Sequence, residues 1–267
     1  MNCKNCNSSL VNSDAYCSIC GAKVVNRISL KSLIAELVEN VFGWDNKYFV
    51  TVKGLITKPG EVLFSYLDGT RKRYMNPLGF LLINLTVVIF IFNILSDQFR
   101  RISNKSSEDQ ISFYAENFGS IYKEESTQNM IREYTTRTQN FYLNYLNIVV
   151  ALILPFYAFL SWLIFKKPYN YGEHLVINSY LLGLSFIFTS LFFIIAITIN
   201  PGLFLFGNLL TVFFYCFAYK KLYKLTLAEI ILKLLIFIGI LIGAVIILSI
   251  IIIIITVVFL IIRDKFL

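Results

Sequence analysis

Long apolar runs alternate with shorter polar segments through most of the chain, and four runs are long enough to cross a hydrocarbon core about 30 Å thick. One of these runs is interrupted by Asn200-Pro201-Gly202, which favours a tight turn, so we divide it into two helices. The pattern predicts an all-α polytopic membrane protein with about five transmembrane helices, at residues 77–95, 143–165, 175–199, 203–219 and 234–262.

Prolines and segment lengths add detail to these predicted spans. Asn76-Pro77 opens the first span, where proline is tolerated because the first helical N–H groups have no partner within the helix. Pro155 lies inside the second span and predicts a kink. The last run would be about 43 Å long at 1.5 Å per residue, so it tilts or begins in the membrane interface. The polar segment 96–142 is a predicted outer loop that is helical in part.

The chain before the spans is more polar and divides into two predicted parts. Residues 1–25 form a small zinc ribbon, and residues 26–76 form an amphipathic helix and a basic, membrane-proximal collar ahead of the transmembrane domain, 77–267. The amphipathic helix is marked by apolar residues at close to helical spacing: Ile28, Leu30, Leu33, Ile34, Leu37, Val38, Val41 and Phe42. It either packs on the membrane domain or lies in the lipid interface. Pro59-Gly60 predicts a break between two short helices, and Gly69 predicts a turn.

Composition and charge support a membrane protein and predict its orientation. Only 15% of residues are charged and 57% are hydrophobic, whereas about a quarter of a soluble domain is charged. The net charge of +8 comes mainly from basic residues beside apolar runs, which disfavours a nucleic-acid partner. Residues 1–76 hold ten Lys or Arg against six acids, and residues 96–142 hold six against seven. The positive-inside rule therefore places the N-terminus in the cytosol and the C-terminus outside. The first 27 residues lack the continuous apolar core of a signal peptide.

Four cysteines near the N-terminus form the strongest local motif. Cys3, Cys6, Cys17 and Cys20 make two C-x2-C pairs that can hold one Zn²⁺ in tetrahedral geometry, and a module this small needs metal binding to fold. Two disulfides or a redox pair are the alternatives, which a cytosolic location and the duplicated spacing disfavour. Because four sulfurs leave no open position, we interpret the zinc as structural.

Two groups of residues outside the cysteine motif are candidates for binding or chemistry. Arg71, Lys72, Arg73 and Tyr74 precede the first span and can hold anionic lipid headgroups or a partner, or serve only as an orientation signal. Glu173 and His174 are weak candidates for acid–base catalysis, although adjacent helical residues point about 100° apart and do not form a dyad. A hydrogen-bonded anchor is the alternative role for His174. If these groups converge, they form one polar cytoplasmic site.

The segment before the first span resembles a family of bacterial membrane proteins of unknown function, DUF3667. The resemblance rests on Thr51, Lys53, Leu55, Pro59-Gly60, Tyr66, Gly69, Arg71, Tyr74 and Pro77, and on Glu173-His174 further along. It implies an N-terminal zinc ribbon followed by several membrane spans, and a bacterial inner-membrane location. The resemblance implies no activity.

The predicted spans hold no acidic or basic residue near the bilayer midplane, which disfavours ion-coupled transport. Their Asn, Ser and Thr residues, such as Asn178 and Asn208, fit hydrogen bonds between helices. We therefore expect a non-enzymatic docking or scaffold protein that binds a protein partner or anionic lipid headgroups at the cytoplasmic surface. The alternatives are a transporter or channel for a small molecule or lipid, and a membrane enzyme acting on a lipid headgroup through Glu173 or His174 with Arg71 or Arg73.

Overall fold

The computed structural model describes residues 2, 6, 8, 9, 16–21 and 47–266, with the backbone alone for residues 120, 244, 245, 247, 248 and 251–266. The chain divides into two compact units, Met1–Asn46 and Lys47–Leu267. In the described part of the first unit, Asn2 and Ser9 form an isolated antiparallel bridge. The amphipathic helix predicted at 28–42 lies outside the described residues, and the zinc ribbon at 1–25, described only in part, stays a prediction.

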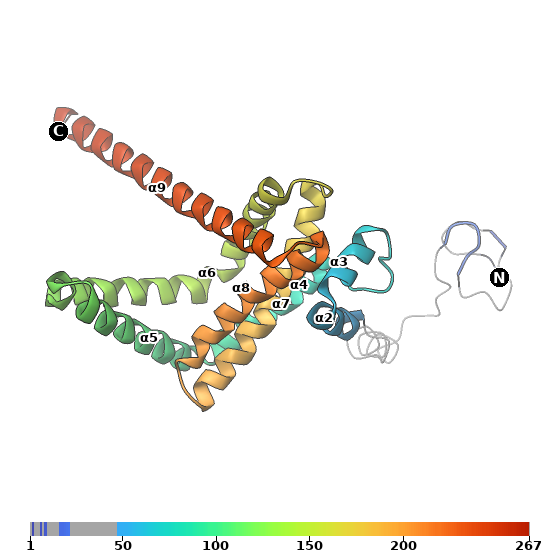
Figure 1. Ribbon diagram of the computed structural model, residues 1–267, viewed down its shortest axis with the longest axis horizontal. Helices are drawn as coiled ribbons and strands as arrows, with labels where there is room; N and C mark the ends of the chain where they lie inside the picture. Colours follow the sequence, from blue (N-terminus) through green and yellow to red (C-terminus); the bar gives the residue numbers. More distant parts are fainter. Residues whose placement is uncertain (1, 3–5, 7, 10–15, 22–46, 267) are drawn as a thin grey trace. The chain divides into compact units, whose positions relative to one another are not determined.

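The second unit is all-helical in its described residues, which confirms the predicted fold class for this part of the chain. Figure 1 shows its helices in chain order. Their bounds are α2 (Lys47–Thr57), α3 (Pro59–Leu67), α4 (Pro77–Ile94), α5 (Ser96–Asn117), the 3₁₀ turn η1 (Ser120–Lys123), α6 (Glu125–Phe165), α7 (Tyr171–Thr198), α8 (Leu203–Tyr223) and α9 (Leu227–Phe266).

The described part of the collar, residues 47–76, consists of α2, α3 and a connecting loop. Only Lys58 separates the two helices, and Pro59 takes the first position of α3, as the Pro59-Gly60 signal predicts. A Cβ atom on Gly60 would lie 2.8 Å from Cβ of Lys221, so α3 packs directly on the backbone of α8. Gly69, with φ of +112°, makes the turn after α3, a conformation that favours glycine.

Met75 ties the collar loop to two helices. Its backbone N–H donates to the hydroxyl of Thr51 in α2 at 2.9 Å, and its carbonyl accepts from the hydroxyl of Tyr180 in α7. The ring of Tyr66 packs edge-on against Tyr180 at 5.4 Å, and Tyr74 is buried. Hydrogen bonds and apolar packing therefore hold this loop on the end of the bundle where α4 and α7 begin.

α7 is the central helix of the bundle and packs against α4, α6 and α8. A Cβ atom on Gly183 would lie 2.7 Å from the Phe80 ring, which shows how closely α7 approaches α4. Four described helices, α4, α6, α7 and α8, are long and apolar enough to cross a membrane. Their outward faces carry many exposed large apolar side chains, as expected for helices that face lipid.

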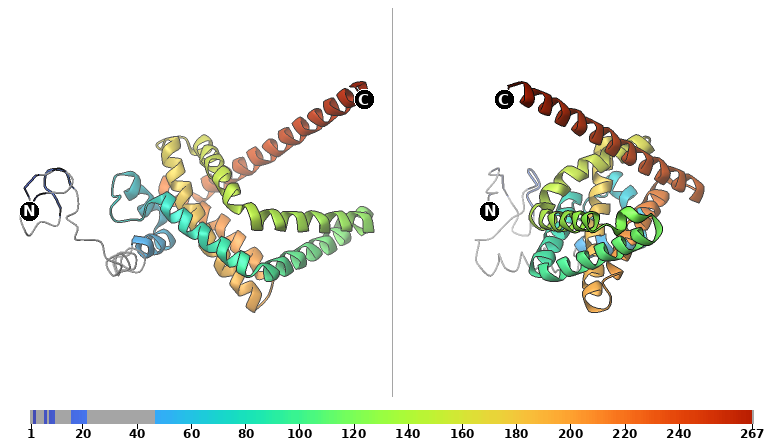
Figure 2. Two further views of the ribbon diagram at one scale, coloured as in Figure 1. Left: turned by 180° about the vertical axis from the view of Figure 1, so that it is seen from behind. Right: turned by 90° about the vertical axis from the view of Figure 1, so that its left-hand side faces the viewer.

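The segment predicted as an outer loop is a helical hairpin. α5 packs along the first part of α6, joined by Arg132 to Glu108 at 2.8 Å and by Gln139 to Asn104 at 2.7 Å. α6 runs without a break from Glu125 to Phe165, so the predicted start of a separate helix at 143 is replaced by one long helix. Pro155 lies within α6, and Figure 2 shows a bend in this helix.

The last two connections bring α8 and α9 to the bundle. Asn200-Pro201-Gly202 lies in the tight connection between α7 and α8, as predicted, with the Asn200 side chain accepting from the Gly202 N–H at 2.8 Å. α9 begins after a capping box between Thr226 and Glu229. Near its start, Lys233 donates to the Ile164 carbonyl at 3.0 Å. The fifth predicted span, 234–262, lies within α9, and its role as a span stays a prediction.

Candidate functional site

Three cysteine sulfurs form a cluster in the described part of the N-terminal unit. Sγ atoms of Cys6, Cys17 and Cys20 all lie within 4.8 Å of one another, and those of Cys6 and Cys17 are 3.7 Å apart. Two sulfurs bound to one Zn²⁺ at about 2.3 Å in tetrahedral geometry would be roughly 3.8 Å apart. Cys3, the fourth predicted ligand, lies outside the described residues. The three cysteines can therefore hold a metal ion.

The backbone around Cys17 also suits a metal ligand. The hydroxyl of Ser8 lies 3.2 Å from Cys17 Sγ. This hydroxyl, with backbone hydrogen bonds from Cys20 and Ile19, lowers the pKa of Cys17 to about 6. Gly21 has a φ of +70° and donates its N–H to the Cys17 carbonyl at 2.9 Å, which closes the turn after the last cysteine. The thiolate is the form that binds metals, so the lowered pKa of Cys17 suits this residue to be a metal ligand.

A cleft of about 460 Å³ opens where the collar loop meets the first turns of α4 and α7; we call it the collar cleft. Its polar lining includes Arg71 from the loop, Asn76 before α4, and Asn170 and Glu173 at the start of α7. Its apolar lining comes from the same helices and the end of α3: Tyr66, Leu67, Pro77, Leu78, Leu175 and Val176. The cleft therefore joins a guanidinium to the N-terminal ends of two helices, which attract anions.

Both helix starts at the collar cleft are capped. Asn76 accepts from the N–H groups of Leu78 and Gly79, at 3.1 and 3.2 Å. Asn170 accepts from the Glu173 N–H at 3.0 Å, and the Glu173 carboxylate accepts from the Asn170 N–H at 2.7 Å. This reciprocal pair is a capping box, so Glu173 has a structural task at the rim of the cleft.

The other residues of the basic cluster lie apart from Arg71. Lys72 is exposed, and the guanidinium of Arg73 lies 5.7 Å from the ring centre of Tyr74. Tyr74 is buried among the collar and α7 residues and does not face solvent. Of the predicted lipid- or partner-binding residues, only Arg71 therefore lines the collar cleft.

His174 points into the bundle, away from Glu173. Its side chain is fully buried, with Nδ1 2.8 Å from the Ser161 hydroxyl and Nε2 3.0 Å from the Tyr223 hydroxyl. Asn178 donates to Ser161 at 2.9 Å and to Tyr219 at 3.1 Å. We call Ser161, His174, Asn178, Tyr219 and Tyr223 the His174 network; it joins α6, α7 and α8.

The hydrogen bonds of the His174 network assign its donors. Ser161 donates to the Ala158 carbonyl at 3.0 Å, so its oxygen accepts from Asn178 and from Nδ1–H of His174. Nε2 then accepts from the Tyr223 hydroxyl, and both nitrogens of the imidazole are occupied. The geometry gives His174 the anchoring role that the sequence offered as one alternative. The imidazole does not reach the collar cleft, whereas Glu173 lines it. The two halves of the predicted Glu173-His174 site therefore lie apart.

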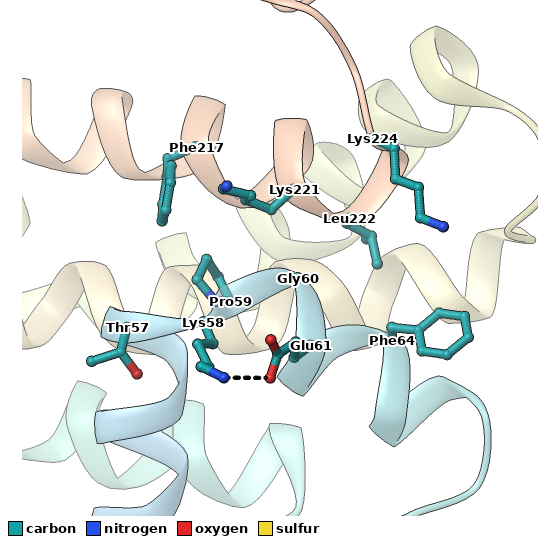
Figure 3. A pocket seen from close by; sticks show the side chains of 10 residues that line it. All are labelled: Thr57, Lys58, Pro59, Gly60, Glu61, Phe64, Phe217, Lys221, Leu222 and Lys224. Atoms are coloured by element: carbon teal, nitrogen blue, oxygen red, sulfur yellow. Dashed lines mark ion pairs between the residues drawn. The ribbon is translucent and has the colours of Figure 1, made fainter.

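A second cleft, of about 320 Å³, lies between the start of α3 and the end of α8. Figure 3 shows that its three lysines do not converge. Lys58 pairs with Glu61 at 3.3 Å, Lys221 lies over the Phe217 ring at 5.7 Å, and Lys224 points away from both. Because these cations are directed to different places, the collar cleft is the better candidate for binding an anion.

These features define a multi-pass integral membrane protein. Its N-terminal unit has a cysteine cluster, and its helical unit has a polar cleft, lined by Arg71 and Glu173, at one end of the bundle. The sequence profile of DUF3667, a family of proteins of unknown function, matches residues 45–89 and confirms the resemblance drawn from the motif. Of the charged motif residues, Lys53 and Arg71 both have exposed side chains. None of the curated proteins and none of the solved structures matches the chain.

Proposed function

We propose that this chain is a docking protein of the bacterial inner membrane, with its N-terminus in the cytosol and its C-terminus outside. The collar cleft binds the headgroup of an anionic phospholipid. The N-terminal unit, folded around a structural zinc ion held by Cys3, Cys6, Cys17 and Cys20, presents a surface to a partner protein. The observation that carries the proposal is the meeting of Arg71 with the first turns of α4 and α7 in one cleft.

The position of the collar cleft along the membrane normal fits a lipid ligand. α4 and α7 both begin here, so the cleft lies at the boundary between water and the hydrocarbon core. Arg71, Asn170 and Glu173 belong to its polar lining, while Leu78 and Leu175 are apolar. A phospholipid can place its phosphate against the guanidinium and the start of an acyl chain along the leucines. Arg is suited to this role because its planar fork matches phosphate oxygens.

The charge distribution supports both the orientation and the sign of the ligand. The segments at the cleft end of the bundle, 47–76, 166–170 and 220–226, hold eleven Lys or Arg against two Asp or Glu. Segment 96–142 holds six against seven. Basic residues next to a cytoplasmic leaflet attract anionic lipids at about 1 kcal/mol each.

The alternative functions find less support in the geometry. A headgroup enzyme of the kind the sequence suggested needs a carboxylate, an imidazole and a guanidinium at one pocket. Glu173 and Arg71 share the collar cleft, but His174 is buried in its own network. A transport pathway would use Asn178 or Asn208. Neither of the two clefts described above is lined by these residues, and Asn178 is buried and hydrogen-bonded.

Native mass spectrometry of the purified protein in detergent tests the lipid ligand. The wild type should retain phosphatidylglycerol several-fold better than phosphatidylcholine, and Arg71→Gln should lose most of this preference. The matched control is Arg73→Gln, which removes an exposed arginine of the same loop that does not line the cleft. The proposal fails if the wild type shows no preference for the anionic lipid, or if Arg71→Gln retains the lipid as well as Arg73→Gln does.

A further inference from the structure

One face of α6 carries exposed large apolar side chains along the part of the helix that pairs with α5, with the exposed Arg137 at the edge of this face. The exposed fractions are 68% for Met130, 72% for Tyr134, 50% for Phe141 and 48% for Tyr145. At 100° per residue these positions fall within an arc of about 60°. Exposed apolar residues that gather on one face, unlike scattered ones, mark a contact surface. We call this face the α6 stripe.

The α6 stripe continues without a break into the span. Ile148 and Leu152, which are 54% and 68% exposed, fall within the same arc and lie in the apolar part of α6. Exposed apolar side chains of a span face lipid. The part of the stripe from Met130 to Tyr145 is therefore an extension of a lipid-facing surface beyond the length that a bilayer core requires.

The two other faces of α6 have different contacts. Thr135 and Gln139 lie about 130° from the stripe and bind Ser107 and Asn104 of α5, at 3.0 and 2.7 Å. The remaining face of α6, between the α5 contact and the stripe, is polar and exposed and includes Thr136. α6 therefore has α5 on one face, a polar surface on the second, and an uncovered apolar stripe on the third.

The length and bend of α6 indicate what covers the stripe. Its 41 residues span about 62 Å, roughly twice the thickness of the hydrocarbon core, so the first part lies outside that core. Figures 1 and 2 show that this part and α5 extend sideways from the end of the bundle, away from the direction of α4, α7 and α8. A helix that runs sideways from the end of a span can rest on the bilayer surface.

We infer that the hairpin of α5 and the first part of α6 lies on the outer surface of the membrane that holds the protein, with the α6 stripe inserted among the lipid headgroups. Tyr134 and Tyr145 are the amphipathic residue type that is enriched at this depth, and Met130 and Phe141 add apolar area. α5 then lies on the side of α6 that faces away from the lipid, which explains its polar surface. The contact of the hairpin with the membrane surface is independent of the collar cleft; its assignment to the outer surface rests on the orientation proposed above.

Tryptophan quenching in the full-length protein, reconstituted in phosphatidylcholine vesicles, tests this inference. The two native tryptophans, Trp44 and Trp162, are first replaced by Phe, and a single tryptophan is introduced by Tyr134→Trp or Phe141→Trp. Thr136→Trp on the polar face is the matched control. All three positions are exposed, so the protein should still fold, which an unchanged unfolding midpoint verifies.

The expected result is that lipids brominated near the glycerol end of the acyl chain quench the tryptophans at 134 and 141 several-fold more than the one at 136. Aqueous iodide should show the opposite order. The inference is overturned if iodide quenches position 134 as strongly as position 136, because the stripe then faces water. It is also overturned if neither agent quenches position 134, because protein, such as a second copy of the chain, then covers the stripe.

Discussion

Gly183 lies where α7 crosses α4, and replacing it with alanine should destabilise the bundle. A Cβ atom there would lie 2.7 and 2.9 Å from two ring carbons of Phe80 and 3.2 Å from the Cα atom of Leu81. Contacts under 3.0 Å force a displacement. Phe80 is fully buried, and its ring packs against Tyr180 and Tyr48, with centroids 5.8 and 5.6 Å away, so it has little room to move.

Two opposing effects set the magnitude. Forcing an extra methyl group into a packed core costs roughly 1–3 kcal/mol, and alanine is favoured over glycine in a helix by about 1 kcal/mol. We therefore expect a net loss of up to about 2 kcal/mol, which raises the unfolded fraction by up to roughly 30-fold. Gly239→Ala in α9 is the matched control, since no atom lies within 4 Å of its Cβ position. This control should be neutral or slightly stabilising.

Unfolding by increasing SDS in mixed micelles, followed by circular dichroism, measures the difference. A second substitution provides a check on the mechanism: Phe80→Leu removes the ring that the new methyl group meets, so the double variant should be more stable than the sum of the two single costs predicts. If Gly183→Ala is as stable as Gly239→Ala, the helices do not cross as closely as described and the reasoning is refuted.

Four further outcomes are expected. Cys17→Ser should lose most of the zinc measured by mass spectrometry while Cys216→Ser keeps it. Because the pKa of Cys17 is lowered even without a metal, bound zinc should be retained below the ordinary thiol pKa and released only when further acidification protonates the thiolates; release at or above the ordinary thiol pKa would contradict this. His174→Ala leaves the Tyr223 hydroxyl without its acceptor and removes one partner of Ser161, and it should cost about 1–3 kcal/mol in the SDS assay, whereas an unchanged midpoint would argue against the network. Thr51→Val removes the acceptor for the Met75 N–H and should cost about 1–3 kcal/mol, with amide exchange at Met75 faster than in the wild type.

Features marked by local sequence signals were predictable. Proline and glycine act through their own backbone restrictions, so Pro59-Gly60 and Asn200-Pro201-Gly202 indicated the right chain breaks without knowledge of the fold. Continuous apolar runs likewise indicated the four long helices. The first part of α6 was predicted less well, because its helical face against α5 is built from Thr135 and Gln139, polar residues that give no hydrophobic period.

The partners of His174 could not be predicted from the sequence. Ser161, Asn178, Tyr219 and Tyr223 come from three helices, and Tyr223 is 49 residues away along the chain. Each is an ordinary residue for a membrane helix, and only the packing of α6, α7 and α8 brings them together. The sequence did show that Glu173 and His174 point in different directions, because adjacent residues on a helix are about 100° apart.

The segment that matches the family builds the end of the bundle rather than a reactive centre. Thr51, Tyr66 and Tyr74 are buried, and each has a packing or hydrogen-bonding role in holding the collar loop on α7. These roles account for the presence of such residues without any ligand. Arg71 has no such role among the contacts described, and its side chain lines the cleft where two helices begin. The resemblance over this segment therefore accounts for how the end of the bundle is built. The function depends on the exposed groups that are held there, and Arg71 is the first of them to test.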